Sequence, residues 1–274
     1  MALSSEFFAC RSRLPCGCVE DAFVSLVKQM IPGSTRAWLR RQRQEGERKL
    51  LRFDRVTDWS VLRRLQPYRS EFGRRRGQCV DRYYIEKFLA SNQEAIRARV
   101  AEIGSSEYTV RFGQGRVLQA DVLDVNEENS RRTMTVDLAQ PHQAPEGLFD
   151  CVIATQVLFV IRDYASAIRT LHKMLKPGGT LLLTLPGISP LVSGRLMAGA
   201  GEDWWRFTSR SAHHEFGAVF GETQVDVQTY GNVLTATAFL YGLVSQELST
   251  EELEYHDPGF EVIIGLRATK SSRL

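Results

Sequence analysis

The amino-acid sequence predicts an α/β fold built on an open parallel β-sheet. The first observation is the stretch Val100–Thr109, an apolar run that ends on Glu102 and Gly104 and then turns polar. Ligands of open parallel sheets bind beyond the carboxyl ends of the strands, and a glycine there lets backbone amides approach a cofactor closely. The second observation is that further apolar runs and helix-like stretches come after it in the order such a sheet requires.

The predicted elements can be placed in order along the chain. Asp81–Asn92 is expected to be a helix, because its apolar side chains fall on one side, as in a helix packed against a sheet. Only Asn126–Arg132 separates the second and third strands, which is too short for a full crossover helix. After the strand that begins at Val100 we expect strands at Val117–Val125 and Thr133–Leu138, a strand from Phe149 to Thr155 and Gln156, a helix at Tyr164–Leu175, a strand at Thr180–Leu185, a helix at Ser209–Phe220, and strands at Thr223–Tyr230 and Glu261–Ala268.

Length and composition favour one α/β domain of ordinary size with an added segment. The chain has 274 residues, of which 43% are hydrophobic, enough for a substantial core. No apolar run is long enough to span a bilayer, and Met1–Gly33 lacks the pattern of a secretion signal, so we expect a cytoplasmic protein. Cys10, Cys16 and Cys18 could suggest zinc, but no clear fourth ligand accompanies them. We therefore interpret them as free thiols and predict no metal.

Charge divides the chain into two parts. Residues 1–78 contain 17 Lys/Arg and 8 Asp/Glu, a net charge of +9, which leaves −6 for the remainder of a chain whose net charge is +3. We predict a basic, mainly helical arm over residues 1–78 and a second domain over residues 79–274. The arm suggests an anionic partner such as nucleic acid, a membrane surface or a phosphorylated carrier, although a solvated helical face also explains it. Its amphipathic stretch Val19–Met30 offers a surface for a homodimer.

Two motifs carry a resemblance to a known family. The sequence Phe-Asp-Cys-Val-Ile at residues 149–153 looks like the fourth strand of the class I S-adenosylmethionine-dependent methyltransferases. Leu-Lys-Pro-Gly-Gly at residues 175–179 looks like the turn before the fifth strand of that family. The resemblance covers about residues 79–268. It implies a Rossmann-like, doubly wound sheet of seven strands with an antiparallel last strand, and S-adenosylmethionine as the cofactor.

The loop after the first strand departs from the usual pattern of this family. The family has Glu/Asp-x-Gly-x-Gly-x-Gly, whereas here Ser106 and Tyr108 stand where the second and third glycines would follow Gly104. The chain also resembles a bacterial subgroup associated with glycan assembly, both in this loop and in Arg-Tyr-Tyr-Ile-Glu at residues 82–86. We therefore interpret the loop as a variant of the family pattern.

The resemblance implies a cofactor site at the ends of the strands. Glu102 would lie near the ammonium group of the cofactor, and backbone amides at Ser105 and Ser106 would face its carboxylate. Asp124 at the end of the second strand would accept hydrogen bonds from the two ribose hydroxyls. The full set of expected cofactor-binding residues is Arg82, Tyr84, Glu102, Gly104, Ser105, Ser106, Asp124, Val125, Asp137, Leu138, Thr155 and Gln156.

Structural roles are open for several of these residues. Asp81 could cap the helix that comes after it, which would leave Arg82 exposed and Tyr84 in the core. Asp124 could cap a turn instead of binding a ribose. Asp137 could be a surface turn residue instead of lying near the adenine amino group, where the resemblance places it.

The connection between the last two strands contains the predicted catalytic residue. The resemblance implies an antiparallel seventh strand, which would open this connection on the same rim as the cofactor, so His256 could take a proton from a hydroxyl acceptor. A loop histidine bonded to its own turn is the alternative. The fourth strand ends in Thr-Gln-Val-Leu at residues 155–158, without the Asn/Asp-Pro-Pro-Tyr/Phe sequence of amino-group and base methyltransferases. We therefore expect oxygen as the acceptor, on a sugar or glycan intermediate as the subgroup resemblance implies.

Three other functions are compatible with the sequence. The same machinery could methylate a small natural product. The basic arm permits an RNA methyltransferase, whose binding would fall steeply with salt, but we do not expect nucleic acid as the partner. Without two of the loop glycines, the domain could also be a scaffold that no longer binds the cofactor. The acids Glu102, Asp124 and Asp137 at their expected strand ends argue against such a scaffold.

Overall fold

The computed structural model describes residues 63–68, 71–73, 75–192 and 202–272. Nearly all of them belong to one compact unit, Leu65–Leu274, which contains the β-sheet and its helices. The basic arm predicted over residues 1–78 lies outside the described residues up to residue 62, as do its amphipathic stretch and the three N-terminal cysteines. No helix among the described residues is both long and apolar enough to cross a membrane.

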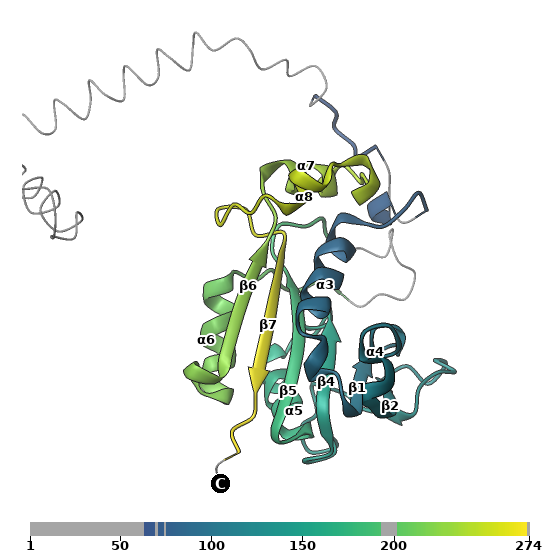
Figure 1. Ribbon diagram of the computed structural model, residues 1–274, viewed down its shortest axis with the longest axis vertical. Coiled ribbons are helices and arrows are strands. Elements are labelled where there is room, and N and C mark those ends of the chain that lie inside the picture. The colour runs from purple at the N-terminus through teal and green to yellow at the C-terminus, as the bar shows by residue number, and fades with distance from the viewer. Residues whose placement is uncertain (1–62, 69–70, 74, 193–201, 273–274) are drawn as a thin grey trace, which may run out of the picture. The chain divides into compact units, whose positions relative to one another are not determined.

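Seven strands form one mixed sheet in the order β3-β2-β1-β4-β5-β7-β6 (Figure 1). Their bounds are β1 Ala98–Ile103, β2 Val117–Asp124, β3 Met134–Thr135, β4 Phe149–Thr155, β5 Leu175–Pro186, β6 Val225–Tyr230 and β7 Ile263–Thr269. Strands β1 to β5 pair in parallel, and β7 runs antiparallel to both of its neighbours. The predicted Rossmann-like, doubly wound sheet with an antiparallel last strand is confirmed.

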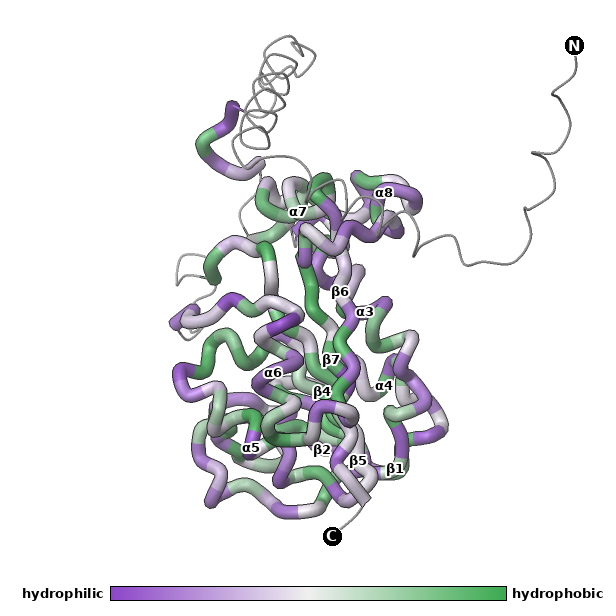
Figure 2. Tube along the Cα trace, turned by 90° about the vertical axis from the view of Figure 1, so that its left-hand side faces the viewer, coloured by the Kyte–Doolittle hydropathy of each residue, from purple (hydrophilic) through white to green (hydrophobic). Residues whose placement is uncertain are grey.

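Helices cover both faces of the sheet. Their bounds are α3 Val80–Ser91, α4 Glu107–Gly113, α5 Tyr164–Met174, α6 Ser209–Phe220, α7 Val233–Leu240 and α8 Thr250–Glu254. Apolar side chains of α5 and α6 pack in one hydrophobic cluster, and those of α3, α4 and α7 pack in another on the opposite face. Figure 2 shows hydrophobic segments gathered along the strands in the interior between these helices.

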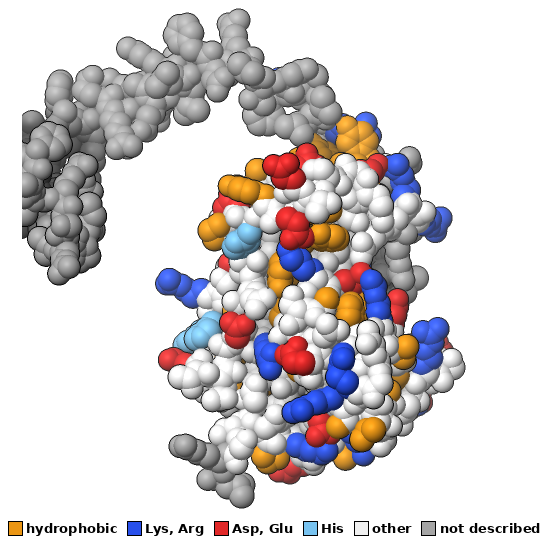
Figure 3. All heavy atoms as spheres, in the orientation of Figure 1, with side chains coloured by type: hydrophobic (Ala, Val, Ile, Leu, Met, Phe, Trp, Pro, Cys, Tyr) orange, Lys and Arg blue, Asp and Glu red, His pale blue; other side chains and the backbone are white. Residues whose placement is uncertain are grey.

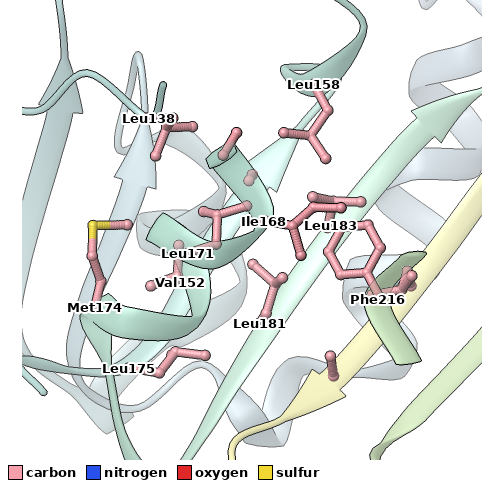
Figure 4. Packing of buried hydrophobic residues seen from close by; sticks show 14 of the residues in the cluster. Leu138, Val152, Leu158, Ile168, Leu171, Met174, Leu175, Leu181, Leu183 and Phe216 are labelled. Carbon is pink, nitrogen blue, oxygen red and sulfur yellow. The ribbon is translucent and has the colours of Figure 1, made fainter. Parts of the chain in front are cut away.

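Successive side chains of the central strands point to opposite faces of the sheet and so contribute to both hydrophobic clusters. In β4, Val152 and Ala154 belong to the α5/α6 cluster, whereas Cys151 and Ile153 belong to the α3/α4 cluster. Figure 4 shows Val152 and the β5 residue Leu181 pointing toward Leu171 of α5. Because both faces of the strand are buried at these positions, Cys151–Ala154 form a continuous apolar run, which is the pattern expected of a parallel strand.

Helix α3 packs on the sheet through one side, and one of its contacts is especially close. Its buried residues Val80, Tyr84 and Phe88 recur every four positions, so they share one side of the helix. A β-carbon added at Gly265 of β7 would lie 2.5 Å from the ring of Phe88. The glycine therefore gives the ring of Phe88 room to lie directly on β7.

Two strands differ most from their predicted bounds, β5 at its start and β3 at its end, whereas the other strands differ by one or two residues. Strand β5 begins at Leu175, because Leu175 pairs with Phe149 before the Lys-Pro-Gly-Gly turn, and the register shifts before Cys151 pairs with Thr180. Strand β3 contains only Met134 and Thr135, since pairing with β2 is limited to these two residues. The connection before β3 contains no helix, as its length predicted.

Candidate functional site

The carboxyl edge of the sheet opens into a cleft of about 590 Å³. Its walls come from the start of α3, the loop after β1, the ends of β4 and β5, and Phe239 of α7. The chain winds outward from β1 through β2 to β3 and then crosses to β4 on the other side of β1. Connections that diverge at this point leave the crevice in which open α/β sheets bind ligands.

A second hollow of about 590 Å³ lies at the opposite edge of the sheet, and three of its charged side chains, Glu94, Asp150 and Arg267, are in ion pairs. Asp150 pairs with Lys176 at 2.7 Å, and Arg267 pairs with Glu94 at 2.7 Å. The amino edge of a parallel sheet is also the edge that ligands of this fold class do not use. The cleft at the carboxyl edge is therefore the candidate site.

Gly104 leaves the end of β1 with a φ of +79°, a conformation that favours glycine. A β-carbon added there would meet no atom within 4 Å and would project into open space. No side chain therefore covers the backbone at the point where a ligand would approach the loop. This single glycine provides close access, although Ser106 and Tyr108 replace the other two glycines of the usual pattern.

The carboxylate of Glu102 is fully used in hydrogen bonds with the loop after β1 and the start of α4. This residue is only 2% exposed, and its carboxylate accepts four hydrogen bonds. One oxygen accepts from Ser105 Oγ at 2.8 Å and from the backbone N–H of Tyr108 at 3.2 Å. The other accepts from the backbone N–H of Thr109 at 2.7 Å and from its hydroxyl at 2.8 Å. This carboxylate therefore anchors the loop and the helix, and it does not line the cleft.

Asp124 lies at the end of β2, beside the loop after β1. Its Oδ1 accepts from the backbone N–H of Asn126 at 2.9 Å, and its Oδ2 accepts from the amide of Asn129 at 2.7 Å. The same Asn129 amide donates to the carbonyl of Gly104 at 3.0 Å. The short β2–β3 connection thus ties the two strand ends together and fixes the orientation of the Asp124 carboxylate.

Asp124 and the other predicted residues of β2 and β3 form a second group, which lies outside the residues that line the cleft. Val125 is 58% exposed beside Asp124. Asp137 accepts from the backbone N–H of Ala139 at 2.9 Å, and Leu138 is buried in the core. These residues lie at adjacent strand ends, in the region where the adenosine part of the cofactor was expected.

The start of α3 places charged groups on one wall of the cleft. Arg82 Nη1 donates to the hydroxyl of Tyr108 at 2.9 Å, and both residues line the cleft. Burial raises the pKa of the Tyr108 hydroxyl, and the neighbouring guanidinium partly offsets the rise. Tyr84, by contrast, is 1% exposed, and its hydroxyl donates to the carbonyl of Leu253 at 3.0 Å. Arg82 therefore lies in the site, whereas Tyr84 packs beneath it.

The end of β4 forms the opposite wall. Thr155 and Gln156 both line the cleft, and Gln156 has a φ of +53°, which a residue with a side chain rarely adopts. Its backbone N–H donates to the carbonyl of Thr184 at 3.0 Å, so pairing with β5 holds the strained conformation in place. Phe159 and Val160 add an apolar surface beyond it. Strain of this kind is frequent at binding sites.

His256 lies away from this cleft. Its Nε2 is 2.8 Å from Thr229 Oγ1 on β6, the outermost strand on the far side of β7, and it is not among the lining residues. The structure therefore brings together Arg82, Ser105, Thr155 and Gln156 around the cleft, with Gly104 and Ser106 in the adjoining loop. It does not bring His256 to them, and the catalytic role of His256 stays a prediction.

Sequence reasoning did not identify Asp81, Tyr108 or Phe239 as cleft residues. The sequence suggests a capping role for Asp81, but the residue at the N-cap of α3 is Cys79, and Asp81 lies in the first turn. Phe239 lies 5.5 Å from Phe72, ring centre to ring centre, in a stacked pair. This pair joins the segment before α3 to α7, far along the chain, and no local pattern predicts such a contact.

Charges are mixed over the face that carries α3 and α4. Figure 3 shows Lys and Arg side chains interspersed with Asp and Glu on this face. Several of them form pairs, such as Arg111 with Glu86 at 2.7 Å. This face of the described unit therefore does not resemble the continuous basic surface that binds nucleic acids.

Comparison with known proteins gives one family and several partial relatives. The sequence profile of a methyltransferase domain family matches residues 82–224. Fusarin C synthetase of Gibberella moniliformis is 41% identical over 61 residues, which is 22% of this chain and 2% of that protein. A polyketide synthase-nonribosomal peptide synthetase of Aspergillus clavatus is 33% identical over 103 residues, 38% of this chain and 2% of that protein. The chain thus spans about 2% of the length of these curated relatives.

Solved methyltransferases are among the structures that this chain resembles. A SAM-dependent methyltransferase from Archaeoglobus fulgidus is 12% identical to this chain, with a TM-score of 0.46. The alignment covers 69% of this chain and 94% of that protein.

Proposed function

The chain belongs to the methyltransferase domain family, which matches it over residues 82–224, and we propose that it methylates a hydroxyl oxygen of a small-molecule acceptor. Its cofactor is S-adenosylmethionine. When bound, the cofactor supplies a methyl group that is activated by its attachment to a positively charged sulfonium sulfur. The observation that supports the proposal is the cleft at the carboxyl edge, with its polar and apolar walls and with the uncovered backbone of Gly104 in the adjoining loop. The residues present fit the cofactor.

The cofactor would be held by groups on β1, β2 and α3. The carboxylate of Asp124, fixed by Asn126 and Asn129, is oriented to accept hydrogen bonds from ribose hydroxyls. Ser105 and Ser106 come directly after the glycine, so their short side chains leave their backbone close to the ligand. Arg82 contributes a positive charge to the same cleft. Asp137 and Leu138 extend the site toward the adenine.

The choice of oxygen rests on the end of β4. The strand ends in Thr155 and Gln156 in place of the Asn/Asp-Pro-Pro motif used with amino groups and bases. The Gln156 amide can both donate and accept a hydrogen bond, so it is suited to orient a hydroxyl. Positioning alone supplies much of the rate of such a transfer, because the acceptor lone pair must be held in line with the methyl carbon.

Two classes of acceptor are supported by separate observations. The matched segments of fungal polyketide and peptide synthetases favour a small natural product that bears a hydroxyl group. The likeness of residues 82–86 and of the loop after β1 to the glycan-associated subgroup favours a sugar. Apolar lining from Phe159, Val160 and Phe239 suits the first class better, so we place the natural product first.

An acceptor screen tests the proposal. The full chain would be incubated with S-adenosylmethionine carrying a labelled methyl group and with panels of hydroxylated polyketides, sugars and amines. We expect label on oxygen of members of the first or second panel, and no label with the variant Asp124→Ala. Label found only on amine nitrogen would contradict the oxygen assignment.

A further inference from the structure

Two phenylalanine rings of the cleft are not among the residues expected to bind the cofactor. Phe72, before α3, and Phe239 of α7 both line the cleft, and their stacked rings lie 5.5 Å apart with an angle of 25° between their planes. They belong to the hydrophobic cluster of α3, α4 and α7, whereas Phe159, Val160 and Val192 reach the cleft from the cluster of α5 and α6. A ligand in the cleft therefore meets apolar groups from both clusters.

The backbone of Phe72 is held in a conformation that such a residue rarely adopts. Its φ is +57°, and strain of this kind is frequent at binding sites. The chain on either side is fixed to the segment after α7. A β-carbon added at Gly73 would lie 2.6 Å from the carbonyl oxygen of Gly242, and the backbone N–H of Ser245 donates to the carbonyl of Gln78 at 2.8 Å. The two rings are therefore brought together before any ligand binds, which lowers the entropic cost of binding.

Three polar side chains that line the cleft outside the expected cofactor site are already bonded within the protein. Arg206 Nη2 donates to Asp203 Oδ2 at 2.9 Å. Gln78 Nε2 donates to Glu86 Oε2 at 2.7 Å, and Gln78 Oε1 accepts from the hydroxyl of Ser245 at 3.2 Å. A sugar needs partners for the hydroxyl groups around its rim, and each one left unsatisfied is costly, whereas the carbons of an aromatic ring need none. The lining therefore favours an aromatic acceptor over a sugar.

The bases of the cleft are weak. Among the lining residues that the structure describes, none is a histidine or a lysine, and the acids are Asp81, Glu86 and Glu107. Carboxylates bind protons weakly, with an ordinary pKa of about 4. An aliphatic hydroxyl holds its proton about as tightly as water, whose pKa is about 16. A phenol has a pKa of about 10, so it gives up its proton far more readily and needs less help from a base.

We propose that the acceptor is a phenol, whose flat ring packs on Phe72 and Phe239 and whose hydroxyl lies at Gln156. This inference rests on the proposed function and deepens it, because it names the class of acceptor for the same site. In the transfer the phenol oxygen forms a bond to the methyl carbon, while the carbon–sulfur bond breaks and its electron pair goes to sulfur. The phenol proton is released to water.

Calorimetric titration of the full chain with S-adenosylhomocysteine present compares three probe acceptors. 2-Naphthol is a flat phenol, decahydro-2-naphthol has the same carbon skeleton without the aromatic rings, and methyl glucoside is a sugar. We expect the wild-type chain to bind 2-naphthol about tenfold more tightly than either of the others. With S-adenosylmethionine that carries a labelled methyl group, the label should appear on the oxygen of 2-naphthol.

Two variants test the rings themselves. Phe72→Leu and Phe239→Leu each remove one ring and keep an apolar side chain. In each variant the affinity for 2-naphthol should fall about tenfold, and the affinity for decahydro-2-naphthol should change by less than about twofold. The affinity for S-adenosylhomocysteine should stay the same. Phe220→Leu is the matched control, because it removes a buried ring of α6 that does not line the cleft, and it should alter none of these affinities.

The results separate the acceptor class from the proposed function. A wild-type chain that binds S-adenosylhomocysteine without preferring 2-naphthol would overturn the phenol assignment and leave the proposed function in place. Equal losses for 2-naphthol and decahydro-2-naphthol in Phe72→Leu and Phe239→Leu would also overturn it, because the rings would then supply only apolar surface. A wild-type chain that does not bind S-adenosylhomocysteine would instead refute the proposed function itself.

Discussion

Replacing Glu102 with alanine is expected to lower the free energy of unfolding by about 3 kcal/mol. The carboxylate of this buried residue accepts four hydrogen bonds, two of them from backbone N–H groups in the first turn of α4. Those N–H groups have no partner within the helix, so their loss of an acceptor is costly. Urea unfolding followed by circular dichroism measures the change.

The neighbouring variant Glu107→Ala provides the matched control. Glu107 lies in the first turn of the same helix but is exposed, so its removal should change the free energy of unfolding by no more than about 0.5 kcal/mol. If Glu102→Ala and Glu107→Ala were equally stable, Glu102 would not anchor the loop as the structure indicates.

Replacing Gly104 with valine is expected to weaken binding of S-adenosylhomocysteine by about 100-fold. The new side chain would project from a φ of +79° into the space that the cofactor requires beside the end of β1. The strain of placing a branched residue in this conformation also costs about 1–2 kcal/mol. Calorimetric titration gives the affinity, and thermal unfolding shows whether the variant is folded.

Gly147→Val separates strain from obstruction. Gly147 has a φ of +57° and also faces open space, but it lies in the turn before β4, at the edge of the sheet away from the cleft. This variant should be strained to a similar degree and yet bind the cofactor normally. Equal loss of binding in both variants would mean that strain, and not the site at Gly104, determines affinity.

The separate strands could be predicted from the sequence because an apolar run is a local feature, whereas the antiparallel last strand was implied by the family resemblance. Apolar runs such as Phe149–Thr155 mark buried parallel strands, and the helix at Ser209–Phe220 has the same bounds in the structure as in the prediction. The early start of β5 could not be predicted, since Leu175 joins the strand by pairing with Phe149 across a turn. Pairing between segments is a property of the folded sheet, which periodicity along one segment does not report.

The site was predicted less completely because side-chain direction depends on the residues that pack nearby. Gly104 and Asp124 occupy strand ends that the sequence places correctly at one edge of the sheet. The direction of the Glu102 carboxylate is set by hydroxyl groups of the loop and of α4, which draw it toward that helix. His256 is bonded to Thr229 on the outer strand β6, three strands from β4. Asp81 lies in a first helical turn, where acids are common, and only the folded structure shows that it also lines the cleft.

The decisive experiment is titration of the purified full chain with S-adenosylmethionine, repeated on Asp124→Ala. We expect about micromolar binding by the wild-type chain and its loss in the variant, because Asn126 and Asn129 fix the orientation of the Asp124 carboxylate that would bind the ribose. Binding of equal strength in both proteins would contradict the placement of the cofactor at the ends of β1 and β2. No binding by the wild-type chain would contradict the account of a working methyltransferase.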